Sequence, residues 1–94
     1  MAILCVSYDL HQASEEDYKP LIKHLKTNYK TWWHHLGSTW FIKTDKSTEE
    51  VLKACVTSLT GKGSIIVFEV GNTWAASGLK DRAYQWLWNN WPEE

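Results

Sequence analysis

The sequence predicts an α+β domain: a four-stranded antiparallel sheet, two helices between its strands and a third helix at the C-terminal end. Four short runs rich in apolar, β-branched and aromatic residues are bounded by polar or turn residues, as strands are. Two longer segments place apolar residues three and four positions apart, as amphipathic helices do. The resulting order, β-α-β-β-α-β, is that of the ferredoxin-like split βαβ arrangement.

The first strand and helix are predicted near the N-terminus. The apolar run AILCVSY, residues 2–8, predicts a buried strand that ends at Asp9. A helix is expected to start at Ser14, because a serine followed by acidic residues is typical of a helix N-terminus. Pro20 falls early enough not to break it. The apolar positions at helical spacing are Tyr18, Leu21, Ile22, Leu25 and Tyr29.

A hairpin is predicted next, with strands at residues 30–36 and 39–44 joined by a two-residue turn at Gly37 and Ser38. This register pairs Leu36 with Thr39, His35 with Trp40, His34 with Phe41, Trp33 with Ile42 and Trp32 with Lys43. Because side chains alternate, one face carries Trp33, His35, Trp40 and Ile42. The opposite face carries Trp32, His34, Phe41 and Lys43.

The more apolar of these two sets, which contains Trp33 and Trp40, is expected to be covered by helices. The set with Trp32, His34 and Lys43 mixes aromatic rings with a titratable group and a cation, which suits a partner or a planar, charged ligand. A register slip of one residue would exchange the two sets.

The second half of the chain completes the pattern. STEE, residues 47–50, predicts a capping box ahead of a second helix. Residues 64–70 predict a buried strand, and residues 79–90 predict the third helix. No linker or repeat interrupts the chain, so residues 1–94 are expected to form a single domain.

Composition limits the possible partners. Ten basic and 11 acidic residues give a net charge of −1, which argues against a polybasic coat and favours a small ligand over a long nucleic acid. Seven tryptophans are more than a core of this size easily buries, so some are expected at an interface or against a flat ligand. A short chain has a thin core, and a homodimer would bury more surface.

The cysteines and the N-terminal segment bear on location. Cys5 and Cys55 lack zinc-site spacing and lie in apolar runs, so they are expected to be small buried thiols in a reducing compartment. The N-terminal segment has neither the basic leader of a signal peptide nor a membrane-spanning length. We therefore expect a cytoplasmic protein with no membrane partner.

Four motifs together resemble the small SinR-like family: YDL (8–10), WWHHLGSTW (32–40), VFEV (67–70) and NTWA (72–75). The resemblance covers nearly the whole chain. Such proteins are similar in fold to the CRISPR-associated adaptation nuclease and to VapD-type endoribonucleases, which dimerise through the open sheet face. The resemblance therefore implies a homodimer with a nuclease-like fold.

The resemblance also carries over to particular residues. Asp9 matches the aspartate that ends the first strand of the adaptation nuclease, where two copies can flank a metal. No further acidic residue is placed to complete such a site, so no cofactor is expected, with Mg²⁺ at Asp9 as the alternative. The positions that match the SinR-like motif are Trp32, His34, Leu36, Ser38 and Trp40.

Three residues are candidates for catalysis. His34 could act as a general acid or base, because an imidazole titrates near neutral pH; alternatively it is a half-buried strand residue. Asp9 could bind a metal or orient a catalytic histidine; alternatively it caps a turn. Ser38 could donate to a phosphate oxygen; alternatively it serves only the turn.

Four residues are candidates for ligand binding. Trp32 and Trp74 could stack on bases, although Trp74 could instead anchor its loop in the core. Lys43 could neutralise a phosphate or protect an edge strand, and Tyr8 has a hydroxyl near Asp9 but otherwise packs in the core. Lys80 and Arg82 are expected to be ordinary solvated charges unless a phosphate lies close.

These residues lead to three functional hypotheses. The first is a phosphodiesterase or nuclease that cleaves a cyclic (di)nucleotide or a short RNA. With RNA as the substrate, the 2′-hydroxyl can be the nucleophile and no metal is needed. The second is a non-catalytic protein that sequesters a signalling nucleotide, for example in a phage–host conflict. The third is a protein-binding dimer whose tryptophans form the interface. The first two share most of their residues.

Overall fold

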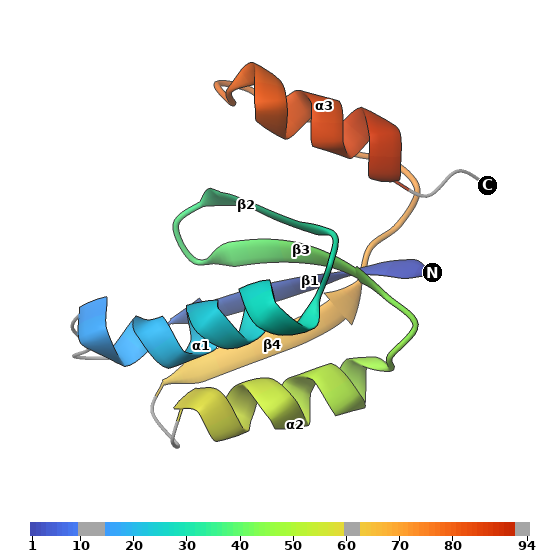
Figure 1. Ribbon diagram of the computed structural model, residues 1–94. Coiled ribbons are helices and arrows are strands. Elements are labelled where there is room, and N and C mark those ends of the chain that lie inside the picture. Colours follow the sequence, from blue (N-terminus) through green and yellow to red (C-terminus); the bar gives the residue numbers. More distant parts are fainter. Residues whose placement is uncertain (10–14, 60–62, 92–94) are drawn as a thin grey trace.

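The computed structural model describes residues 1–9, 15–59 and 63–91. It confirms the predicted α+β, ferredoxin-like order followed by a C-terminal helix (Figure 1). The elements are β1 (Ala2–Asp9), α1 (Glu15–Asn28), β2 (Trp32–Leu36), β3 (Thr39–Thr44), α2 (Thr48–Leu59), β4 (Ser64–Glu69) and α3 (Asp81–Asn90). The helix start expected at Ser14 lies outside the described residues. None of the helices among the described residues is long and apolar enough to cross a bilayer.

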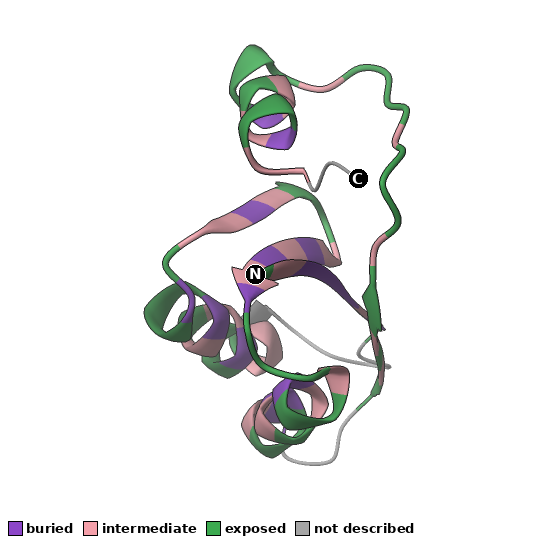
Figure 2. Cartoon of the chain, turned by 90° about the vertical axis from the view of Figure 1, so that its right-hand side faces the viewer, coloured by how far each residue is buried: buried purple, intermediate pink, exposed green. Residues whose placement is uncertain are grey.

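The sheet has the strand order β2-β3-β1-β4. All three neighbouring pairs are antiparallel, with β1 between β3 and β4. The first strand thus lies beside the third and not beside the second. Helices α1 and α2 lie on one side of the sheet, and α3 lies on the other side, near β2 (Figures 1 and 2). β4 and β2 are therefore the two edges.

The main core lies between the sheet and helices α1 and α2. Alternating residues of β1 and β3 point into it, and each helix supplies one apolar stripe. The predicted capping box starts α2: the Ser47 backbone N–H donates to Glu50 Oε1, and the Glu50 N–H donates to Ser47 Oγ, each at 3.2 Å. The buried core residues are Leu4, Val6, Tyr8, Leu21, Leu25, Tyr29, Trp40, Ile42, Val51, Cys55 and Leu59.

The predicted register of the β2–β3 hairpin is wrong beyond its first pair. The observed pairs are Trp32 with Ile42, Trp33 with Phe41, and Leu36 with Thr39. Between them the register shifts, so that His34 and His35 lie opposite the single residue Trp40, as in a β-bulge. One extra residue exchanges the two faces of a strand. Trp32 therefore lies on the same face as Trp40, and Trp33 lies on the opposite face. This is the reverse of the predicted face assignment.

The reason for this register is that both faces of the hairpin are covered. On the α1 side, the Trp32 ring lies 5.2 Å from that of Trp40. On the opposite side, Trp33 is buried beneath α3, where its Nε1–H donates to the Ala83 carbonyl oxygen at 3.2 Å. Sequence reasoning assumed one open face, whereas the bulge allows both tryptophans to pack.

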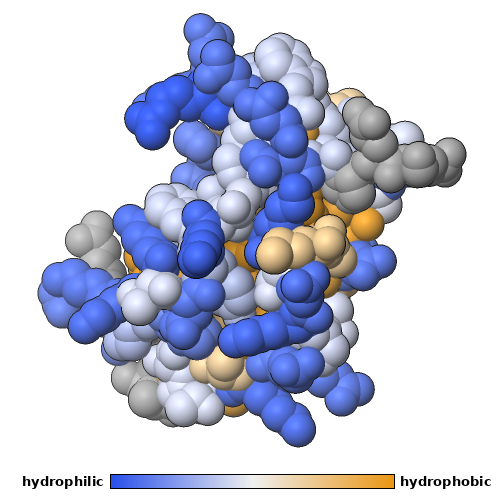
Figure 3. Space-filling view, turned by 45° about the vertical axis from the view of Figure 1, so that its right-hand side comes forward, coloured by the Kyte–Doolittle hydropathy of each residue, from blue (hydrophilic) through white to orange (hydrophobic). Residues whose placement is uncertain are grey.

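A second apolar cluster holds α3 on the sheet. Trp33, Ala83 and Leu87 are its buried members. Apolar surface remains visible between α3 and the rest of the molecule (Figure 3). The partly buried members are Phe41, Trp74, Leu79, Trp86 and Trp91. One face of α3 thus docks on the sheet.

Replacing Trp33 should weaken the docking of α3. Trp33→Ala is expected to lower the free energy of unfolding by about 3–5 kcal/mol, because a buried indole and its hydrogen bond are lost. Trp33→Phe should cost less, since the ring area stays. Trp88, on the same helix but 69% exposed, provides the control, and Trp88→Ala should cost less than about 1 kcal/mol. Urea unfolding measures all three, and equal losses for Trp33→Ala and Trp88→Ala would contradict the assignment.

The two thiols are buried, as predicted. Burial raises the pKa of both Cys5 and Cys55 to about 11. At pH 8 only about one thiol in a thousand is then a thiolate, which is the reactive form. We expect the native protein to resist iodoacetamide at pH 8, and both cysteines to be alkylated in guanidinium chloride, as read by mass spectrometry. Alkylation of the native protein at the unfolded rate would show that the thiols are accessible.

Candidate functional site

One end of the sheet gathers most of the predicted site residues. The Tyr8 backbone N–H donates to the Ser38 carbonyl oxygen at 3.1 Å, so the end of β1 lies beside the hairpin turn. Asp9 follows Tyr8 at the same end and pairs with Ser64 of β4. The start of α3 also lies near the hairpin turn (Figure 1). The fold thus joins three segments that are far apart in the sequence.

A cavity of about 500 Å³ lies between the hairpin turn and the segment that leads into α3. We call it the hairpin cavity. Gly78 has φ +78° there, a left-handed conformation that side chains other than glycine rarely adopt. This glycine turns the chain so that residues 77–80 form one wall. The lining residues are His34, His35, Leu36, Gly37, Ser77, Gly78, Leu79 and Lys80.

The hairpin cavity is cationic. Its lining includes two imidazoles and Lys80 and has no carboxylate side chain, although Asp81 follows in the first turn of α3. Burial lowers the pKa of His35, and the positive charges of Arg82, Lys80 and His34 lower it further. His35 is therefore mainly neutral at pH 7, with one ring nitrogen available as a proton acceptor.

His34 is held by two contacts. Its ring stacks on the buried Trp40 ring, with the centroids 4.0 Å apart and the planes 14° from parallel. Its Nε2 lies 3.2 Å from the Gly37 carbonyl oxygen. A carbonyl oxygen only accepts hydrogen bonds, so Nε2 carries the hydrogen, and Nδ1 of the neutral ring is left as an acceptor. The predicted acid–base candidate is thus fixed in one orientation.

Tyr8 is buried and lies behind the turn. Its hydroxyl oxygen accepts a hydrogen bond from Trp40 Nε1 at 3.1 Å. Burial raises the pKa of Tyr8, so its hydroxyl stays protonated at neutral pH. Tyr8 also lines a smaller cavity of about 400 Å³ on the α1 side of the turn. The other lining residues there are Tyr18, Lys19, Ile22, Gly37 and Ser38.

Asp9 shares the sheet end but not the hairpin cavity. It is exposed, and alternation along β1 points it away from the face that holds Tyr8. In the described part of the chain, no group of three or more His, Cys, Asp or Glu side chains is arranged to hold a metal. Mg²⁺ is usually held in proteins by one or two carboxylates together with waters and substrate phosphates, so Mg²⁺ at Asp9 stays a prediction.

Three predicted ligand-binding residues lie elsewhere. Trp32 packs against the main core, with Lys26 Nζ 5.4 Å from its ring centroid. Trp74 packs in the α3 cluster, where its ring centroid lies 6.4 Å from Tyr84. Lys43 lies five residues along β3 from Ser38, which is about 16 Å in an extended strand. These three do not line the hairpin cavity.

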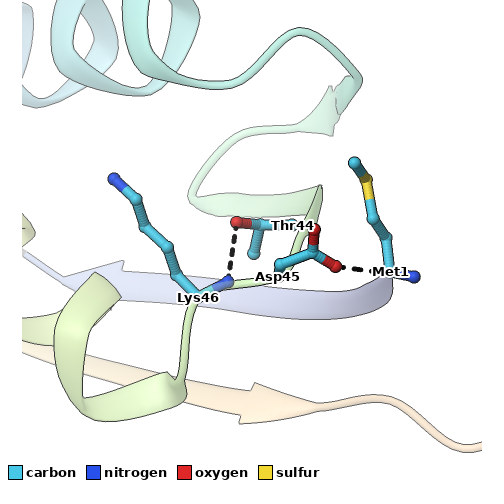
Figure 4. Close-up of polar contacts among 4 residues, drawn as sticks. All are labelled: Met1, Thr44, Asp45 and Lys46. Carbon is cyan, nitrogen blue, oxygen red and sulfur yellow. Dashed lines mark hydrogen bonds and ion pairs between the residues drawn. The ribbon is translucent and has the colours of Figure 1, made fainter.

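Lys43 lines a different cavity, of about 530 Å³, at the opposite end of β3. Its lining carries charges of both signs, among them Lys30, Lys46, Asp45 and Glu50. Some of the lining residues contact one another (Figure 4). The Met1 amino nitrogen lies 3.7 Å from Asp45 Oδ1, and the Lys46 backbone N–H donates to Thr44 Oγ1. Because its lining carries both signs of charge, this cavity is less selective for anions than the hairpin cavity.

Sequence reasoning missed two basic residues. Lys80 and Arg82 were expected to be ordinary solvated charges, yet both act on His35. Only the fold brings the start of α3 to the hairpin, so spacing along the chain carries no sign of it. Tyr18 was likewise expected only as an apolar helix position, and Lys19 was not singled out.

Comparison of the chain with protein-family models and with curated proteins finds no match. The resemblance to the SinR-like family therefore remains a prediction.

Removing the neighbouring positive charges should raise the pKa of His35. Arg82→Gln and Lys80→Gln are each expected to do so, because less repulsion then opposes the imidazolium. NMR titration of the ring protons measures the change. Lys53→Gln, an exposed change on α2, is the control and should leave the His35 titration in place. If the pKa of His35 changed in neither Arg82→Gln nor Lys80→Gln, or changed equally in Lys53→Gln, the two charges would not lie close to His35.

Proposed function

We propose that this protein is a small nucleotide-directed phosphodiesterase that acts on a cyclic (di)nucleotide or a short RNA. We further propose that it works as a cytoplasmic homodimer with one hairpin cavity in each copy. One observation carries the proposal: His34, His35 and Lys80 line a cavity whose lining has no carboxylate side chain, and the charge of Arg82 acts on His35. Such a site attracts the charge of a phosphodiester and offers groups that exchange protons at neutral pH.

The proposed reaction on RNA needs only side chains of this chain. The neutral His35 accepts the proton of the 2′-hydroxyl as that oxygen attacks the adjacent phosphorus. The bond from phosphorus to the 5′-oxygen breaks, and His34 in its imidazolium form donates a proton to the leaving oxygen. A 2′,3′-cyclic phosphate and a free 5′-hydroxyl result. Lys80 stabilises the charge on the phosphate oxygens.

The size of the ligand follows from charge. A net charge of −1 disfavours long nucleic acids, whose binding depends on many phosphate contacts. A cavity of about 500 Å³ lies in the range of small-molecule sites. A ligand with one or two phosphates therefore fits this site better than a polymer.

The second candidate is a protein that sequesters the same ligand without cleaving it. One observation favours it: the Nε2 hydrogen of His34 is already bonded to Gly37, and its ring is stacked on Trp40. A ring held in this way can bind a phosphate through Nδ1–H in its cationic form without ever transferring a proton. Both candidates use the same cavity, so the experiment has to separate turnover from binding.

Incubation with cyclic dinucleotides and short RNAs, followed by chromatography before and after heat release, makes this separation. A phosphodiesterase converts ligand to linear or shortened product. His34→Gln keeps an N–H for Gly37 but cannot transfer protons, so it should lower the rate by about 10²–10⁴-fold. Lys80→Ala should weaken binding, and the matched Lys53→Ala should not.

Each other outcome has a defined meaning. Ligand that disappears from solution and returns intact on heating supports sequestration. If His34→Gln turns over like the wild type, His34 is not the proton donor. If no ligand binds or changes, or if Lys53→Ala weakens binding as much as Lys80→Ala, the hairpin cavity is not the site.

A further inference from the structure

One edge of the sheet lacks the protection that edge strands usually carry. Among the described residues β4 pairs only with β1, and its sequence SIIVFE contains no proline and only one charge, Glu69 at its end. Proteins commonly protect such edges with prolines, lysines, bulges or a covering segment. The other edge, β2, is shorter and is interrupted at His34 and His35. Only β4 presents a regular, apolar edge.

The backbone of β4 is ready to pair with another strand. The Val70 N–H donates to the Ile3 carbonyl oxygen, so the backbone groups of residue 70 point toward β1. In an antiparallel pair these directions alternate from residue to residue. The N–H and C=O groups of Ile65, Val67 and Glu69 therefore point outward. Within the described ranges, no strand pairs with this edge.

Two apolar side chains lie beside this backbone edge. Ile66 and Phe68 are 58% and 45% exposed, on the sheet face opposite α1 and α2. α3 covers the β2 side of that face and leaves the β4 side exposed (Figure 2). On the other face, α2 packs against β4 and has its own exposed apolar residue, Val56.

We propose that a second copy of this chain pairs with β4 in the antiparallel sense, with the twofold axis through Val67. The outward groups of Val67 then bond those of the partner's Val67. Ile66 lies opposite the partner's Phe68, and Phe68 opposite the partner's Ile66. The two four-stranded sheets join into one sheet of eight strands. This inference rests on the homodimer named in the proposed function and specifies its interface, a sheet edge instead of the open sheet face that the resemblance implies; it does not rest on catalysis in the hairpin cavity.

Charge favours the antiparallel arrangement over the parallel one. A parallel pair in register would place the two Glu69 carboxylates side by side, which is unfavourable. The antiparallel pair places Glu69 opposite the partner's Ile65. The two carboxylates then lie about 14 Å apart along the strands, which exceeds a screening length of about 8 Å. The edge is therefore complementary to itself only in the antiparallel sense.

Sedimentation and disulfide trapping test the arrangement. The wild type should sediment with twice the chain mass of 10.9 kDa, and Phe68→Lys should halve that mass. Because Ile66 faces the partner's Phe68, the double variant Ile66→Cys/Phe68→Cys should form a disulfide-linked dimer under mild oxidation. Ile66→Cys alone and Phe68→Cys alone should not, but a mixture of the two should. The native thiols are buried and do not compete.

Three results would overturn the proposal. One is a wild type that stays at 10.9 kDa at its highest soluble concentration. Another is efficient linkage of the single variants, which would indicate stacked sheet faces instead of paired edges. The third is a dimer in which the double variant forms no linkage. Circular dichroism of Phe68→Lys checks that a lower mass does not come from unfolding.

Discussion

The buried indole of Trp40 connects the core of this protein to its candidate site. Its ring lies in the main core, its N–H is bonded to the Tyr8 hydroxyl, and its face carries the His34 ring. Tyr8 in turn is bonded through its backbone to the turn residue Ser38. The position of the imidazole thus depends on the packing of the whole sheet against α1 and α2. A solvent-exposed histidine on a free hairpin would have no such support.

The fold was predictable because its signals are local. The capping box of α2, the helical spacing in α1 and the two-residue turn each act within a few residues, and each recurs in the structure. The hairpin register was not predictable for a physical reason. Trp32 and Trp33 are equally apolar neighbours, so alternation alone does not decide which of them faces α1. The decision depends on α3, which lies some 50 residues away and covers the second face.

Part of the candidate site was also predictable from local signals. His34, Ser38, Tyr8 and Asp9 were chosen by residue type near a turn and a strand end, and all four lie at one end of the sheet. Lys43 was chosen by type as well but lies at the other end of its strand. Lys80 and Arg82 join the site only through the turn at Gly78 and the packing of α3. Sequence separation hides such contributions, because the fold alone brings these segments together.

The attachment of α3 links binding in the hairpin cavity to the docking of this helix. The Trp91 Nε1–H donates to the Gly71 carbonyl oxygen at 2.8 Å, so the segment from residue 71 to residue 91 closes on itself. It meets the rest of the molecule chiefly through Trp33 and Phe41. Local opening of this segment would remove one wall of the cavity and leave the main core intact. A molecule that fills the cavity and touches this wall must therefore also stabilise the docked helix, so occupancy and helix docking are linked equilibria.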